Sequence, residues 1–283
     1  MNPQKERSSS EPTNIPVILV HGWKSHPGIW KNLITELNRH SIPNYSFSHT
    51  KMTDASPHEI ALALQDYLRT LRTTTGYAGP VDIITHSMGG MATRYLLEVI
   101  DSTDREILVR QLILIAAPNN GSTMAEIFNH PEHGPDVRRT LAGVFVPYQY
   151  DPAQDRCVQG IRIQGKETAE VKQAGLREDI IYRNILAENI TQNPDFFPHF
   201  QGKTWSFTPE GGWQQTFKGD GVIPHTDSFL SGTGADILPR NAKALNTDPI
   251  RYCHLHLPTN PEVINRIIEY LTDPETTPDF ICP

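Results

Sequence analysis

The chain has 283 residues, which is long enough for one α/β domain with an insertion. Its 32 acidic and 25 basic residues give a formal net charge of −7 without a Lys/Arg-rich run, so nucleic acid is not an expected partner. Three cysteines lack metal-ligand spacing, which argues against a disulfide framework and a zinc site. No stretch reaches the roughly 18 apolar residues of a membrane span. We expect a soluble, cytoplasmic protein, or a secreted one if a signal was removed, with neither cofactor nor metal.

The first 14 residues are polar and lack hydrophobic periodicity, which predicts a flexible tail. The aliphatic run at residues 15–20 is typical of a strand that is buried on both faces of a parallel sheet. Helical spacing follows at residues 29–37, and alternation at 45–50 predicts a short strand. A second helix is expected to begin at Ser56-Pro57, because serine is a good N-cap and proline suits the first helical position.

The central motif is the segment 81–90, an apolar run that ends at Ser87 and passes directly into a helical pattern. A nucleophile elbow needs a sharp turn from strand to helix, with small residues two before and two after the nucleophile. Gly89 meets this need, whereas Thr85 adds a β-branched side chain where the backbone is most crowded. The pattern predicts Ser87 at a helix N-terminus, where the helix dipole favours a developing oxyanion.

Downstream, residues 109–117 form another strongly apolar run, and strands that alternate with helices imply a parallel sheet with helices on both faces. Between residues 123 and about 200 the alternation fails, and one helical pattern extends around Leu176–Ile190. We interpret residues 123–200 as a partly helical, lid-like insertion over the C-terminal ends of the strands, in a single domain of residues 15–283. A strand at 204–208 and a helix at 262–271 complete the expected elements.

Three motifs that are separated in the sequence bear on the function. They are Val20-His21-Gly22-Trp23, then Thr85-His86-Ser87-Met88-Gly89-Gly90 with its helix, and Gly219–Pro224 followed by histidines near the C-terminus. Together they resemble a lipase or esterase of the α/β-hydrolase superfamily, in the manner of the bacterial triacylglycerol lipases. The resemblance implies the α/β-hydrolase fold, a mostly parallel central sheet flanked by helices, with a lid or cap insertion.

Ser87 would be the nucleophile. A serine hydroxyl needs a neutral imidazole to take its proton, and the imidazole needs a buried carboxylate to fix its tautomer. Asp220, between two glycines, is the candidate acid, since the order Ser, Asp, His follows this superfamily. A β-turn role is the alternative for Asp220, because Asp-Gly is a common turn pair. Other candidates for the acid are Asp227, which is the nearest, Asp236 and Asp248.

The base is one of two histidines near the C-terminus, His254 or His256. Lipases that this chain resembles often place the base six residues before an Asn-Pro-Glu-Val helix start, which here begins at Asn260 and indicates His254. His256 is the alternative base. We expect His21 and His86 to act as structural hydrogen-bond donors behind their turns.

The oxyanion requires two preorganised main-chain N–H donors. One is expected from Met88, directly after the nucleophile. The resemblance implies Trp23 as the other donor, with its indole making the acyl side of the pocket large and apolar.

These features indicate a serine hydrolase that cleaves carboxylic esters, with an ester or lipid as substrate, through an acyl-enzyme. An acyltransferase or amidase on the same triad is the alternative enzyme, and a non-catalytic α/β-hydrolase-like binding protein is the alternative from another class. Contact with a lipid interface would be transient, since no segment is expected to insert stably into a membrane. The sequence does not define an oligomeric state.

Overall fold

The computed structural model describes residues 15–208, 212–273 and 275–282, and the tail predicted for residues 1–14 lies outside them. Seven strands form the central sheet in the order β2-β1-β3-β4-β5-β8-β9. All neighbours pair in parallel except β8 and β9, which pair antiparallel. The strands are β1 (Val17–Val20), β2 (Asn44–Phe47), β3 (Val81–His86), β4 (Val109–Ile115), β5 (Ile181–Ala187), β8 (Gly234–Leu238) and β9 (Phe280–Ile281). The predicted mostly parallel sheet is confirmed.

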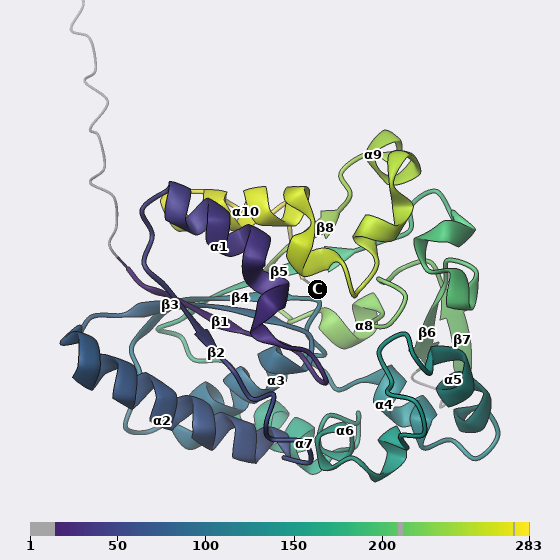
Figure 1. Cartoon of the computed structure of the whole chain (residues 1–283), viewed down its shortest axis with the longest axis horizontal. Helices are drawn as coiled ribbons and strands as arrows, with labels where there is room; N and C mark the ends of the chain where they lie inside the picture. Colours follow the sequence, from purple (N-terminus) through teal and green to yellow (C-terminus); the bar gives the residue numbers. More distant parts are fainter. Residues whose placement is uncertain (1–14, 209–211, 274, 283) are drawn as a thin grey trace, which may run out of the picture.

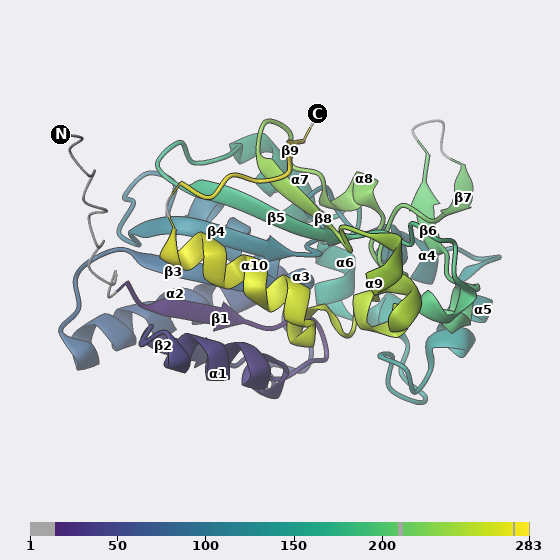
Figure 2. The same ribbon diagram turned by 90° about the horizontal axis from the view of Figure 1, so that it is seen from above.

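Helices cover both faces of this sheet (Figure 1). One face carries α1 (Lys31–Arg39) and α10 (Pro261–Thr272), which lie side by side over the strands (Figure 2). The other face carries α2 (Pro57–Thr75), α3 (Met88–Arg94), the π-helical continuation Tyr95–Ile100 and α7 (Lys166–Ala174). The sheet is therefore the middle of three layers, as expected for parallel strands connected through helices.

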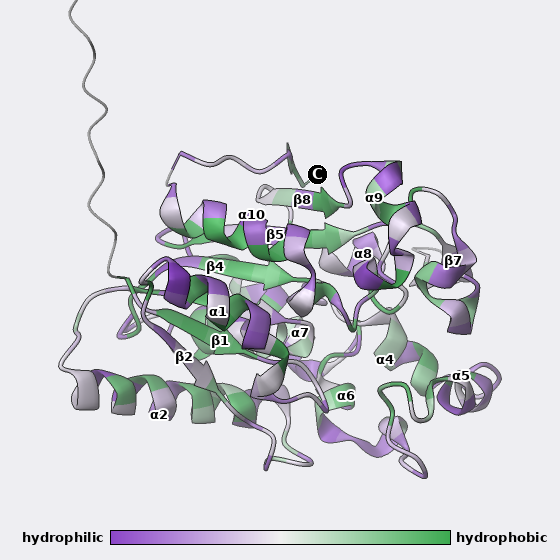
Figure 3. Ribbon diagram, turned by 45° about the horizontal axis from the view of Figure 1, so that its top comes forward, coloured by the Kyte–Doolittle hydropathy of each residue, from purple (hydrophilic) through white to green (hydrophobic). Residues whose placement is uncertain are grey.

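Hydropathy follows these layers. Strands β1 and β3 are buried at every position, and in Figure 3 the central strands are hydrophobic along most of their length. Helices α2 and α10 instead present hydrophobic residues to the sheet and hydrophilic residues to solvent, which is the pattern of a helix that covers a core on one side. Among the described residues, no helix combines the length and the apolar character that crossing a membrane requires.

The predicted start of α2 is confirmed. The Ser56 side chain accepts a hydrogen bond from Glu59 N (3.3 Å), and the Glu59 carboxylate accepts one from Ser56 N (2.9 Å). This reciprocal capping box satisfies two main-chain donors that a helix start leaves without partners, with Pro57 at the first position. At the other end Gly76 takes a left-handed conformation (φ +68°) that stops the helix.

Shorter elements gather beyond the carboxyl ends of the central strands, where α4, α5 and a separate two-stranded antiparallel sheet lie together (Figure 1). That small sheet pairs β6 (Thr204–Phe207) with β7 (Trp213–Thr216). The short α-helices are α4 (Thr123–Phe128), α5 (Gly134–Leu141), α6 (Arg156–Gly160), α8 (His225–Ser228) and α9 (Ala242–Thr247). The 3₁₀ turns are Pro27–Trp30, Pro152–Gln154, Pro194–Phe196, Pro198–Phe200, Pro249–Tyr252 and Leu257–Thr259. The lid role of residues 123–200 stays a prediction.

The helix predicted around Leu176–Ile190 was wrong. This segment contains β5, which pairs in parallel with both β4 and β8 and is buried from Tyr182 to Ala187. A short apolar run that is buried on both faces cannot be distinguished from a helix by periodicity.

Strands β6 and β8 also differ from expectation, and β7 and β9 were not predicted. The strand predicted at residues 204–208 exists as β6 but pairs with β7 instead of joining the central sheet. Strand β8 was not predicted, because Asp236 interrupts its apolar run. Within the fold this carboxylate is fully buried and accepts a hydrogen bond from Arg266 Nε at 2.9 Å, which compensates its charge.

Candidate active site

Ser87 lies at the turn between β3 and α3, in the predicted elbow. Its backbone has φ +56° and ψ −133°, a conformation that a residue with a side chain rarely adopts. A Cβ atom on Gly89 would lie 2.6 Å from the carbonyl oxygen of His21 and 2.8 Å from that of Val20, so only glycine fits there. The turn therefore packs directly against the end of β1 and presents Ser87 at the carboxyl edge of the sheet.

Thr85, the departure from the usual small residue, is fully buried in β3. Its hydroxyl has no hydrogen-bond partner among the described residues. A Cβ atom on Gly90 would lie 3.1 Å from this hydroxyl and 2.5 Å from Ala117 Cβ. The space that Thr85 needs is thus supplied by Gly90, three residues after the nucleophile.

The structure brings Ser87, His254 and Asp220 together from three separate segments. His254 Nδ1 lies 2.6 Å from Asp220 Oδ2, and His254 Nε2 lies 2.9 Å from Ser87 Oγ. With the Nδ1 proton donated to the carboxylate, Nε2 is free to accept the serine proton. His254 and Asp220 are 4% and 1% exposed, so the imidazole and the carboxylate are shielded from water, whereas Ser87 is partly exposed.

Asp220 is itself held by main-chain donors. Its Oδ1 accepts hydrogen bonds from Val222 N (2.9 Å) and Ile223 N (2.7 Å), which leaves Oδ2 for the imidazole. His254 N also donates to the Asp220 carbonyl at 2.9 Å, so the two segments are joined through backbone as well as side chains. The orientation of the carboxylate is fixed before any substrate binds.

The alternative acids and the alternative base lie elsewhere. His256 is exposed. The carboxylate of Asp227 accepts hydrogen bonds from Thr123 N (2.6 Å) and Thr123 Oγ1 (2.8 Å), and burial raises its pKa to about 7. Asp236 is paired with Arg266, and Asp248 with Arg251 at 2.6 Å.

Two further histidines support the turns, as predicted. His86 Nε2 donates to the His254 carbonyl oxygen at 3.0 Å, and burial lowers the pKa of His86 well below its usual value. His21 Nδ1 donates to the Gly22 carbonyl at 3.0 Å, while its Nε2 accepts from His49 N at 3.3 Å. Burial, followed by the neighbouring His49, lowers the pKa of His21 to about 4. Both imidazoles are therefore neutral near pH 7.

The two residues predicted to supply the oxyanion donors, Met88 and Trp23, line the same cavity as Ser87. Met88 is the first residue of α3, so its main-chain N–H has no acceptor within that helix. In the loop after β1, a Cβ atom on Gly22 would lie 3.0 Å from Ser87 Cβ, which shows how closely the backbone before Trp23 approaches the nucleophile. The roles of Met88 and Trp23 stay predictions.

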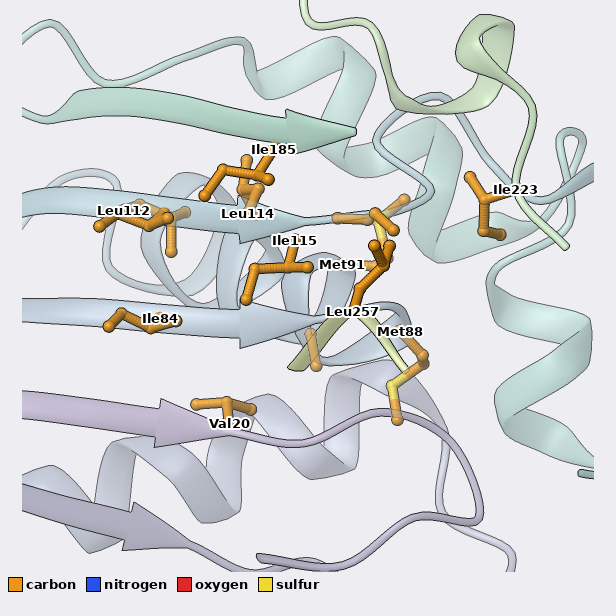
Figure 4. Close-up of a cluster of buried hydrophobic side chains, with 14 of the residues drawn as sticks. Val20, Ile84, Met88, Met91, Leu112, Leu114, Ile115, Ile185, Ile223 and Leu257 are labelled. Atoms are coloured by element: carbon orange, nitrogen blue, oxygen red, sulfur yellow. The ribbon is translucent and has the colours of Figure 1, made fainter. Parts of the chain in front are cut away.

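A cavity of about 300 Å³ opens beside Ser87 and His254. Its walls are mainly apolar and come from α4 (Met124, Phe128), from the segment after α5 (Val144, Phe145) and from the loop of Asp220 (Val222, Ile223). In Figure 4, Met88 and Ile223 lie beyond the carboxyl ends of the strands, whose own side chains fill the core. Ser87 and His254 therefore lie beside a mainly apolar cavity at the carboxyl edge of the sheet.

A family model described as a domain of unknown function, DUF7379, matches residues 3–147, just over half of the chain. The chain belongs to this family. No curated protein matches the sequence.

Several solved structures resemble this member of the DUF7379 family. The mature lipase BlEst2 from Bacillus licheniformis has a TM-score of 0.63 at 14% identity, covering 95% of this chain and 96% of that one. Phospholipase PlaB from Legionella pneumophila has a TM-score of 0.57 at 15% identity, over 94% of this chain and 60% of that one. The metagenomic carboxyl esterase MGS0156 has a TM-score of 0.57 at 12% identity, over 92% and 77% of the two chains. With the seven-stranded sheet, these likenesses show an α/β-hydrolase fold.

One residue near the site, Asp155, was not predicted from the sequence. Asp155, in the segment between β4 and β5, has a buried carboxylate whose Oδ2 accepts a hydrogen bond from Trp23 Nε1 at 3.1 Å. The only local signal is that Asp155 precedes a helix as its N-cap. Its contact with Trp23 joins residues that are 132 positions apart, and no local pattern encodes such a contact.

Proposed function

We propose that the protein is a serine hydrolase that cleaves carboxylic esters, with Ser87 as nucleophile, His254 as general base and acid, and Asp220 as the carboxylate that orients His254. The observation that carries this proposal is the hydrogen-bonded chain from Ser87 Oγ through His254 to Asp220, at 2.9 and 2.6 Å, at the edge of an apolar cavity. An unactivated serine would not need a buried imidazole whose second nitrogen faces a carboxylate.

The reaction begins when His254 Nε2 takes the hydroxyl proton of Ser87 and the serine oxygen attacks the ester carbonyl carbon. Negative charge on the carbonyl oxygen would be stabilised by the N–H groups of Met88 and Trp23. As the tetrahedral intermediate collapses, the imidazolium gives its proton to the leaving alcohol, and an acyl-enzyme forms on Ser87. A water molecule then attacks the acyl-enzyme carbonyl while His254 takes one of its protons. As this second intermediate collapses, the imidazolium returns the proton to Ser87 Oγ and the carboxylic acid is released.

The cavity supports an apolar acyl group as the part of the substrate that binds beside Ser87. Ligand sites commonly measure about 300–1,000 Å³, so this cavity of about 300 Å³ is at the small end of the range and favours a short or medium acyl chain. The names of the similar structures, a lipase, a phospholipase and a carboxyl esterase, agree with an ester or lipid substrate. Within this class we propose a bacterial lipase-like enzyme that meets lipid interfaces transiently.

Hydrolysis of p-nitrophenyl esters of increasing acyl length tests the proposal. Wild-type protein is expected to release p-nitrophenol and free acid, fastest with short or medium chains, and Ser87→Ala is expected to lower kcat by up to about 10⁶-fold. Ser102→Ala, at an exposed serine beyond the end of the Tyr95–Ile100 segment, is the matched control and should retain full activity. Equal turnover by Ser87→Ala and wild type would overturn the proposal, and transfer of the acyl group to an added alcohol in place of water would identify an acyltransferase.

A further inference from the structure

Asp155 divides its two carboxylate oxygens between two tasks. Oδ1 accepts hydrogen bonds from Cys157 N (2.8 Å) and Val158 N (3.2 Å), which makes Asp155 the N-cap of the short helix α6. This capping contact lies entirely within the segment between β4 and β5, and many polar residues cap helices in the same way. The second oxygen points to a different part of the molecule.

Oδ2 of Asp155 binds the loop that follows β1. It accepts hydrogen bonds from Trp23 Nε1 (3.1 Å) and from the Tyr150 hydroxyl, and it forms an ion pair with Lys24 Nζ at 3.1 Å. The Asp155 side chain is 1% exposed, and that of Lys24 is 20% exposed. We call Asp155, Trp23, Lys24 and Tyr150 the Asp155 cluster; it joins the proposed oxyanion loop to the segment between β4 and β5.

Within this cluster, Asp155 and Lys24 are both ionised at neutral pH. Burial alone would raise the pKa of Asp155, but the hydrogen bonds from Tyr150, Trp23 and Lys24 together hold it below its usual value. Burial alone would likewise lower the pKa of Lys24, but Tyr150 and Asp155 raise it. Hydrogen bonds to an ionised carboxylate are stronger than those between neutral groups, so the cluster holds its members firmly.

Lys24 has a strained backbone, which explains why the loop needs such an anchor. Its φ of +50° lies in the left-handed region, where residues with side chains persist only if their surroundings hold them. Lys24 Nζ also donates to the Thr53 carbonyl at 2.8 Å and lies 4.2 Å from the centre of the Tyr150 ring. Trp23, which carries the proposed oxyanion donor, is therefore fixed through its own indole and through the strained residue after it.

We propose that Asp155 is a positioning residue of the active site: by holding the Trp23 indole and the Lys24 ammonium, it sets the direction of the Trp23 main-chain N–H toward the oxyanion. This inference rests on the proposed ester hydrolysis. Asp155 does not contact the reacting atoms and acts through Trp23, whose loop already approaches Ser87 at Gly22. The segment between β4 and β5 would then complete the catalytic site in addition to lining the cavity.

Asp155→Ser separates the two tasks, because serine is as good an N-cap as aspartate but offers no second oxygen to Trp23 and Lys24. An oxyanion contact forms in the transition state, so kcat and kcat/KM for p-nitrophenyl butyrate should both fall about 10- to 100-fold with KM nearly unchanged. The inhibition constant of a trifluoromethyl ketone, which forms an oxyanion on Ser87, should rise by a similar factor. Asp151→Asn is the matched control, since Asp151 also caps a helical turn of this segment but contacts Arg138 and not Trp23.

A purely structural role for Asp155 predicts a different result. In that case fewer molecules would react with a fluorophosphonate, but kcat per reactive site and the affinity for the ketone would equal those of wild type. This outcome would overturn the role of Asp155 and leave the proposed ester hydrolysis standing. Trp23→Phe, which removes the indole donor and keeps a smaller aromatic ring, should shift kcat and ketone affinity in the same direction by a smaller factor, and it decides the question if Asp155→Ser does not fold. Absence of Ser87-dependent turnover in wild type would instead overturn the proposed function, and the inference with it.

Discussion

Asp220 and Asp155 are both buried carboxylates in which one oxygen accepts two main-chain N–H groups and the other accepts side-chain donors. They differ in charge compensation. Asp155 is paired with Lys24, whereas the side-chain donor to Asp220 is the imidazole of His254. In the proposed reaction, the negative charge of Asp220 would be available to the imidazolium that forms on His254, whereas the charge of Asp155 is already balanced by Lys24. In the proposed mechanism, the same anchoring geometry would support proton transfer on one side of Ser87 and positioning of the Trp23 backbone on the other.

The largest effect is expected when the carboxylate of Asp220 is replaced. Asp220→Asn removes the charge and presents an amide donor to His254 Nδ1, which favours the tautomer that cannot accept the Ser87 proton. Removing this charge in a serine triad typically costs about 10⁴ in kcat. The loss should be measured with p-nitrophenyl butyrate at pH 7 to 8.

Asp227→Asn provides the matched control, because this buried carboxylate has a pKa of about 7 and contacts Thr123 instead of His254. It should leave kcat close to the wild-type value. If the two substitutions reduced kcat equally, the assignment of Asp220 as the triad acid would be wrong. The loss for Asp155→Ser should fall between those of these two variants.

A smaller effect is expected when the pH is lowered: the protein should lose stability because His21, in the loop after β1, becomes protonated on unfolding. The folded protein holds the pKa of His21 at about 4, mainly by burial, whereas His21 in the unfolded chain titrates near 6.5. The unfolded state therefore binds more protons between these values, so stability should fall as the pH is lowered from 6.5 toward 4. Thermal unfolding of wild type should show a decreasing Tm in this window.

His21→Asn sharpens this prediction. The variant lacks the titrating group, so its Tm should depend less on pH between 6.5 and 4, even if it is less stable than wild type at pH 8. Parallel Tm curves for the two proteins would show that protonation of His21 does not cause the loss of stability between pH 6.5 and 4.

The parts of the fold that could be predicted from the sequence are those whose pattern lies within a few consecutive residues. The elbow, the first strand and the start of α2 carry their turn, burial and capping patterns within a few residues, so the sequence predicted them directly. Strand β5 was mistaken for a helix because its apolar run is buried on both sides by β4 and β8, which lie far away in the sequence. Thr85 looked unfavourable because the space that it needs is supplied by Gly90, which lies outside the positions two before and two after the serine. A contact between distant residues, as in β5, also concealed Asp155, which binds Trp23 132 positions away.

Covalent labelling of Ser87 tests the central claim most directly. After reaction with a fluorophosphonate, mass spectrometry of the wild-type protein should find one adduct, on the peptide that contains Ser87. The labelling rate should fall strongly in His254→Ala and stay near the wild-type rate in His256→Ala, because His254 contacts the serine and His256 is exposed. An unlabelled Ser87, or equal labelling rates in all three proteins, would contradict the account.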